Sequence, residues 1–243
     1  MDRSSNPNLP QRYARIAGAL YLVIILVGLL GQVLVKDRLI VAGDVAATAA
    51  NIAASQTLWR ITVAGEIGYL ALGVVLGWLL YLLLRPIDRD LALLGVFFNL
   101  VSIAVEVGAR SSLLATLVLL GRSTALAAFE PQQLHALAYV SLRMHDYGFS
   151  LSLIFFGVVC LIFGHLIRKS RFLPALVGTL MQIAGACYLV NSFALLLAPS
   201  LARALFPAIL LPALIGEATL CLWLLFKGVD VARWTKAAAA PQR

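Results

Sequence analysis

The sequence predicts an all-α, polytopic integral membrane protein: a helix bundle with six transmembrane helices and both termini in the cytoplasm. Three observations carry this prediction. Of the 243 residues, 62% are hydrophobic and only 12% are charged, whereas a soluble domain has about 25% charged residues. Six apolar runs are long enough to cross the bilayer hydrocarbon, which takes about 20 helical residues. Lys and Arg residues gather in the tails and on alternate connections.

The distribution of positive charge predicts the orientation. Twelve Lys or Arg residues lie on the side of the two tails, against six on the opposite side. Because positively charged loops stay in the cytoplasm, residues 1–15 and 227–243 are expected to be cytoplasmic tails around a transmembrane domain at 16–226. The net charge of +8 follows from this bias. No basic run alternates with aromatic residues, so we expect no nucleic-acid partner.

The first two spans are expected at Ile16–Val35 and Leu58–Leu84. The first exceeds the apolar core of a signal peptide and is expected to remain as an anchor. Between the spans, Asp44 can cap a short alanine-rich helix that ends near residue 55. Trp59 is expected to mark the outer membrane interface, where tryptophan is enriched.

The third span, Leu91–Leu120, contains only two charged residues, Glu106 and Arg110. Four residues apart on a helix, they face the same side, with the acid before the base as such pairs prefer. Charged groups are expensive at membrane depth. This pair is therefore expected to face protein or water rather than lipid.

The second half of the chain predicts a surface helix and three further spans. Pro131 suits the first turn of an amphipathic helix, expected to lie on the outer membrane surface and to end near Asp146. Spans four to six are expected at Tyr147–Ile167, Phe172–Leu197 and Leu205–Phe226. Pro212 is expected to kink the last span, and the tail after it is expected to become disordered beyond a short helical segment.

Polar residues inside the spans supply the candidate site. Most of them fall between the membrane midplane and its outer face, which predicts a polar cavity there. Three acids would share one cation, Arg110, for a net charge of −2, and protonation or a bound cation would relieve their repulsion. The predicted ligand-binding residues are Glu66, Glu106, Arg110, His145, Asn191 and Glu217.

Three kinds of function remain open. The first is binding or transport of a small or lipidic ligand, a cation or a proton in that cavity. The second is an intramembrane enzyme that uses His145 and the carboxylates, with or without a divalent metal. The third is a structural or partner-binding subunit, because the GxxxG step at Gly73 and Gly77 allows close helix approach. No catalytic residue is assigned.

Metal ligands and cofactors are not expected. No paired-histidine motif such as H-E-x-x-H occurs, although His145 with Asp146 and Glu66 or Glu106 would offer mixed nitrogen and oxygen donors. The three cysteines stand singly in apolar runs and indicate packing. The bilayer is the one expected partner besides a small-molecule, lipidic or cation ligand, and the oligomeric state stays open.

Several short stretches resemble a known family. They are RIAGALY at 15–21, GDVAATAAN at 43–51, HDYGF at 145–149 with FFG at 155–157, LP at 173–174 and LPALIGE at 211–217. Together they resemble the bacterial membrane family labelled domain of unknown function 4386, from about Arg12 to about Gly228. The resemblance implies a multi-pass protein of the bacterial inner (plasma) membrane with six helices, and it implies no activity, cofactor or catalytic residue.

Overall fold

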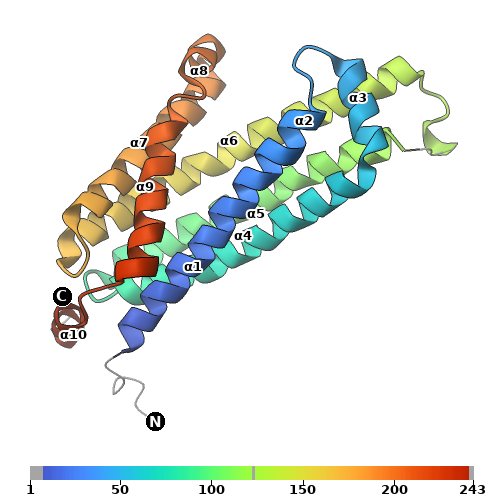
Figure 1. The fold of residues 1–243 in the computed structure, drawn as a ribbon. Coiled ribbons are helices and arrows are strands. Elements are labelled where there is room, and N and C mark those ends of the chain that lie inside the picture. The colour runs from blue at the N-terminus through green and yellow to red at the C-terminus, as the bar shows by residue number, and fades with distance from the viewer. Residues whose placement is uncertain (1–7, 122–123, 241–243) are drawn as a thin grey trace. The chain divides into compact units, whose positions relative to one another are not determined.

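The computed structural model describes residues 8–121 and 124–240 (Figure 1). Arg3, Arg122 and Arg243, which belong to the charge count above, lie outside these ranges. Every regular element in the described ranges is helical. Six helices, at Leu9–Leu39, Gln56–Leu84, Arg89–Leu119, Pro131–Ser170, Ala175–Leu197 and Leu210–Lys227, are long and apolar enough to span a membrane. In hydrocarbon a helix satisfies its own backbone hydrogen bonds, which favours this architecture.

The chain divides into two compact units. Unit 1 contains the described residues of 1–23, 72–103 and 150–243, and unit 2 contains residues 24–71 and the described residues of 104–149. Helices α1 (Leu9–Leu30), α4 (Gln56–Leu84), α5 (Arg89–Leu119) and α6 (Pro131–Ser170) each contribute one segment to each unit.

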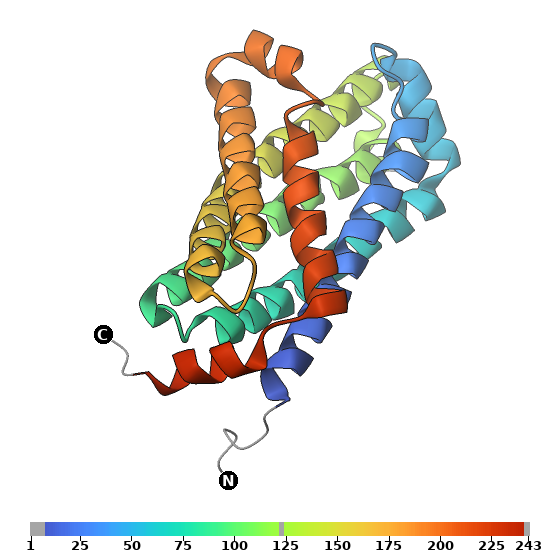
Figure 2. The same ribbon diagram turned by 60° about the vertical axis from the view of Figure 1, so that its left-hand side comes forward.

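In unit 1, α7 (Ala175–Leu197) and α9 (Leu210–Leu222) pack side by side (Figures 1 and 2). The short helix α8 (Pro199–Leu205) connects them. The π-helical turn η4 (Trp223–Lys227) and α10 (Val231–Ala239) follow α9.

Unit 1 also contains the GxxxG step of α4. A side chain of α5 packs against these glycines. Asn99 Nδ2 donates a hydrogen bond to the carbonyl oxygen of Gly73 at 3.2 Å. A Cβ atom on Gly77 would lie 2.5 Å from that same amide nitrogen. The step thus packs two helices of this chain together.

In unit 2, α1 continues through the π-helical turn η2 (Gly31–Lys36) and α2 (Asp37–Leu39). The helix α3 (Val45–Ala54) follows, with Asp44 as its N-cap: the carboxylate accepts a hydrogen bond from the backbone nitrogen of Ala47 at 2.8 Å. This confirms the capped helix predicted there. A short 3₁₀ turn, η3 (Thr124–Leu126), precedes α6.

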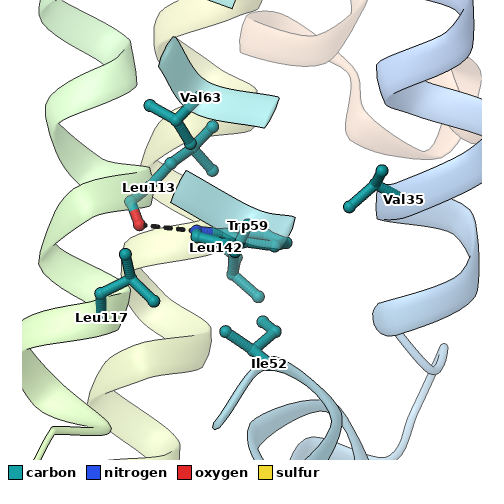
Figure 3. Close-up of a cluster of buried hydrophobic side chains, with 7 residues drawn as sticks. All are labelled: Val35, Ile52, Trp59, Val63, Leu113, Leu117 and Leu142. Atoms are coloured by element: carbon teal, nitrogen blue, oxygen red, sulfur yellow. Dashed lines mark hydrogen bonds between the residues drawn. The ribbon is translucent and has the colours of Figure 1, made fainter. Parts of the chain in front are cut away.

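The apolar core of unit 2 surrounds Trp59. Figure 3 shows its indole nitrogen directed at the carbonyl oxygen of Leu113, to which it donates a hydrogen bond at 3.0 Å. Trp59 is 1% exposed, so its indole packs inside the core of unit 2 rather than facing lipid or water. The reason is the coverage by Ile52 of α3 and the neighbouring aliphatic side chains. The complete cluster is Val35, Ile52, Trp59, Val63, Leu113, Leu117 and Leu142.

Two expectations about the second half are wrong. The predicted surface helix and span four form one continuous helix of 40 residues, α6. No residue at 145–149 breaks the helix, because the packing accommodates each of them. Pro212 does not kink a span, since α9 begins at Leu210 and a first-turn proline sacrifices no helical hydrogen bond. The predicted short helical segment of the tail is α10, where Asp230 caps the helix and Trp234 Nε1 donates a hydrogen bond to the Leu83 carbonyl oxygen at 2.9 Å. Residues 241–243, where the predicted disorder would fall, lie outside the described residues.

Candidate functional site

Unit 2 gathers an ionisable cluster from four helical segments. It consists of six side chains: Lys36 from η2, Glu66 and Tyr69 from α4, Glu106 and Arg110 from α5, and His145 from α6. Four of them belong to the predicted site, namely Glu66, Glu106, Arg110 and His145. The sequence argument missed Lys36 and Tyr69.

Arg110 is the centre of the cluster. Its Nη2 lies 2.6 Å from Glu106 Oε1, which confirms the predicted pair four residues apart. The same Nη2 donates a hydrogen bond to the Tyr69 hydroxyl at 2.7 Å, and this hydroxyl donates to Glu106 Oε1 at 3.1 Å. Arg110, Tyr69 and Glu106 thus form a closed ring of polar contacts, which fixes the guanidinium relative to α4 and α5.

Glu66 lies between two cations. Its Oε1 is 2.7 Å from Lys36 Nζ, and its Oε2 is 3.2 Å from Arg110 Nε. The second contact has the distance of an ion pair, yet neither atom makes a hydrogen bond within the described part of the chain. We therefore treat it as an electrostatic contact with poor hydrogen-bond geometry, weaker than the contact to Lys36.

Lys36 enters the cluster because the first helix is longer than expected. The predicted span stopped at Val35, and it placed Lys36 in the aqueous loop. In the structure the helix continues to Leu39 through the π-helical turn, and the Lys36 side chain is only 9% exposed. A π-helical turn has no clear sequence signature, but the apparent excess of acids over bases is a signal that a second cation was missing.

The cluster is electrically balanced. With all four side chains ionised, the two positive charges of Lys36 and Arg110 balance the two negative charges of Glu66 and Glu106. The expectation of one cation among three acids is therefore wrong for this cluster. Balance is essential here, since Glu66 and Arg110 are each 2% exposed and an unpaired charge at such depth is strongly destabilising.

His145 contacts Arg110 through Nε2, which faces the guanidinium Nη1. Because arginine has only donors, this contact requires Nε2 to accept, so the imidazole is neutral with its proton on Nδ1. Nδ1 lies 3.5 Å from Asp146 Oδ1. The ring stacks on Phe149, with 6.4 Å between ring centroids, and the Arg110 guanidinium lies 6.0 Å from the same Phe149 centroid. His145 thus acts as an acceptor for Arg110.

The two other predicted site residues belong to unit 1. Glu217 of α9 accepts a hydrogen bond from the Tyr21 hydroxyl at 2.8 Å and another from the Tyr188 hydroxyl. Asn191 is half-buried on α7, three residues after Tyr188. A cavity of about 30 Å³ in this unit is lined by Tyr21, Asn99 and Cys160 among others. It is large enough for a water molecule and too small for an organic ligand.

No group of three or more His, Cys, Asp or Glu side chains that could hold a metal ion occurs among the residues that the structure describes. Asp146 instead pairs with Arg143 at 2.8 Å, and both side chains are about half exposed.

Gly148 brings α5 and α6 together one turn from His145. A Cβ atom on Gly148 would lie 2.5 Å from the Ala109 Cβ, closer than any real side-chain contact. We expect Gly148→Val to force the helices apart, with a loss of about 1–3 kcal/mol of stability from overpacking. Thermal unfolding in detergent measures it. Gly108→Val is the matched control, since a Cβ on Gly108 meets nothing within 4 Å; equal losses in both variants would contradict the expectation.

The fold and the site together define the class of protein. The six spanning helices leave large apolar side chains exposed along their length, including Leu30, Ile61 and Val118. Such surfaces are buried in lipid or against a partner, and the chain is a multi-pass membrane protein with a buried ionisable cluster.

The chain belongs to the family described as a domain of unknown function (DUF4386), whose model matches residues 16–228. This confirms the resemblance noted from the sequence. Neither a search of curated proteins nor a search of solved structures finds a significant match.

Proposed function

We propose that this protein binds or transports a small or lipidic ligand, or a cation or a proton, at the ionisable cluster of unit 2. The observation that carries the proposal is the burial of four charged side chains in spans that could otherwise be wholly apolar. Replacing a buried ion pair by well-packed apolar residues is often neutral or stabilising. Stability alone therefore does not account for the cluster, and ionisable groups inside a membrane commonly serve ligand or ion pathways.

The contacts of His145 favour this class over an intramembrane enzyme. A general base or metal ligand needs a ring nitrogen directed at a substrate or an ion. Here Nε2 is directed at Arg110, and Nδ1 faces Asp146. Likewise, the glycine step of α4 supports packing within the chain more than a partner helix, because Ile103 and Asn99 occupy it.

A ligand screen tests the proposal. Purified full-length protein would be unfolded thermally with soluble carboxylates, phosphates, amines, metal cations and lipids. We expect at least one class to raise the unfolding temperature of the wild-type protein in a concentration-dependent manner. Glu106→Gln should change the size of this rise, because it removes one negative charge from the cluster.

Glu130→Gln is the matched control, since Glu130 is exposed and precedes α6. It should retain the response. If no compound class stabilises the protein, or if Glu106→Gln responds as the wild type does, the proposed function is wrong.

We also propose that the protein resides in the bacterial inner membrane with both termini in the cytoplasm. The support is the excess of Lys and Arg on the side of the tails. Reporter fusions that are active on only one side of the membrane, placed after residue 243 and in the loop near residue 128, measure the orientation directly.

A further inference from the structure

Glu66 occupies the position that a bound anion would take. Its two carboxylate oxygens contact two cations from different helices, Lys36 through Oε1 at 2.7 Å and Arg110 through Oε2 at 3.2 Å. Both cations are buried. We propose that a monoanionic oxyanion group, a carboxylate or a phosphodiester, replaces Glu66 between Lys36 and Arg110, and that one proton binds together with it. This inference rests on the proposed function and names its ligand class.

The geometry shows where the exchange begins. Arg110 Nη1 contacts His145 and Nη2 contacts both Tyr69 and Glu106. Nε carries a further N–H, and it is buried without a hydrogen-bond partner in the described chain, as is the facing Glu66 Oε2. Buried donors without partners are rare and costly. A ligand oxygen that accepted from Nε–H would satisfy it, while guanidinium recognition of oxyanions supplies the specificity.

The proton follows from charge balance. The cluster is neutral with Lys36, Glu66, Glu106 and Arg110 all charged, so adding one anion alone would leave a buried net charge of −1. When a proton from water adds to the displaced Glu66 carboxylate, the acid becomes neutral and the balance is restored. One anion and one proton then enter together, and no other change of charge is needed.

The charged and titratable groups around Glu66 come from every segment packed on it. Lys36 contributes from η2, Tyr69 from α4 itself, Glu106 and Arg110 from α5, and His145 from α6 through Arg110. His145 stays a neutral acceptor in this scheme, and Glu106 stays paired with Arg110. Glu66 is the acid that gives up both its partners when the ligand binds, so it is the group that takes the proton.

Gly31 leaves a small space beside Glu66. A Cβ atom on Gly31 would be 3.4 Å from Glu66 Oε1 and equally close to Thr62 Cγ2. The glycine thus keeps a space of about one methyl group beside the carboxylate, on the side of the Lys36 contact.

Glu66→Gln tests the inference with acetate as the probe, whatever the natural ligand is. Glutamine mimics the protonated acid, so this cluster would carry a net charge of +1 and should bind an anion at neutral pH. We expect acetate, titrated into chloride-free buffer, to raise the unfolding temperature of the full-length variant by about 5–10 °C at a hundredfold excess over its dissociation constant. The wild-type protein should show a larger effect at the lower of two pH values, because binding takes up a proton.

Two double variants locate the site. Glu66→Gln with Lys36→Met makes the cluster neutral again and should lose the response to acetate. Glu66→Gln with Arg38→Met removes an exposed cation two residues after Lys36, and this variant should keep the response to acetate. An absent response in Glu66→Gln, or an equal response in both double variants, overturns the inference. If Glu66→Gln does not fold, the wild-type protein decides, and equal stabilisation at both pH values overturns proton uptake.

The source of the anion is resolved in lipid nanodiscs. Stabilisation of Glu66→Gln by phosphatidylglycerol over phosphatidylcholine, without acetate, identifies a lipid headgroup; stabilisation by acetate in phosphatidylcholine alone identifies a free anion. Failure of the inference is distinct from failure of the proposed function. If only amines or metal cations stabilise the protein through the cluster, the function stands and the anion inference falls, whereas a screen without any hit removes both.

Discussion

Arg110→Ala is expected to destabilise the protein by about 3–5 kcal/mol, the usual cost of removing one partner from a buried charge network. The substitution leaves Glu66 and Glu106 buried with Lys36 as the one remaining cation of the cluster, and it removes the hydrogen-bond donor of Tyr69 and His145. For a chain of this length the corresponding fall in unfolding temperature is about 6–20 °C. Thermal unfolding in detergent or nanodiscs measures it.

The control for Arg110 is Arg143→Ala. Arg143 also forms an ion pair with a carboxylate on its own helix, at 2.8 Å from Asp146, but its side chain is 48% exposed. Exposed pairs contribute between about 0 and 1 kcal/mol. If the two alanine variants lose the same stability, the cluster is not the buried network described above.

Trp59→Ala is the second substitution with a large expected effect. It empties the centre of the unit 2 core (Figure 3), and truncation of a buried tryptophan costs about 3–5 kcal/mol. The loss also removes the hydrogen bond from the indole N–H to the Leu113 carbonyl oxygen. Trp59→Phe retains most of the packing and should lose less, chiefly the hydrogen bond at about 0.5–1.5 kcal/mol.

Trp78→Ala is the matched control for the core. Trp78 lies on the same helix, but its side chain is 52% exposed, so truncation should change the stability far less. A loss for Trp59→Ala no larger than that for Trp78→Ala would show that Trp59 is not part of a packed core. Both variants are compared by the midpoint of thermal unfolding.

The sequence predicted most of the architecture, because hydropathy over 20 residues is a strong signal in a chain of this composition. The six spans, the Asp44 cap and the start of α6 at Pro131 were all predicted. Helix boundaries were less predictable. The first span runs past Val35 because a π-helical turn carries it on, and no local residue pattern announces such a turn.

The candidate site was predictable only in part. The pair of Glu106 and Arg110 followed from helical spacing alone. Lys36 and Tyr69 could not be assigned, because their place in the cluster depends on how η2 and α4 pack against α5, which no spacing within one helix reveals. The same limit applies to Trp59. Enrichment at interfaces describes tryptophans in general, whereas the burial of Trp59 depends on its coverage by α3.

The unbroken length of α6 has a consequence for how the molecule meets water. Forty residues rise roughly 60 Å along a helix axis, about twice the thickness of bilayer hydrocarbon. At the tilts of up to about 40° that spanning helices adopt, α6 still extends beyond the hydrocarbon core. Its N-terminal turns, residues 131–142, are continuous with His145, so an antibody or a crosslinker directed at them would attach to the helix that carries one member of the buried cluster.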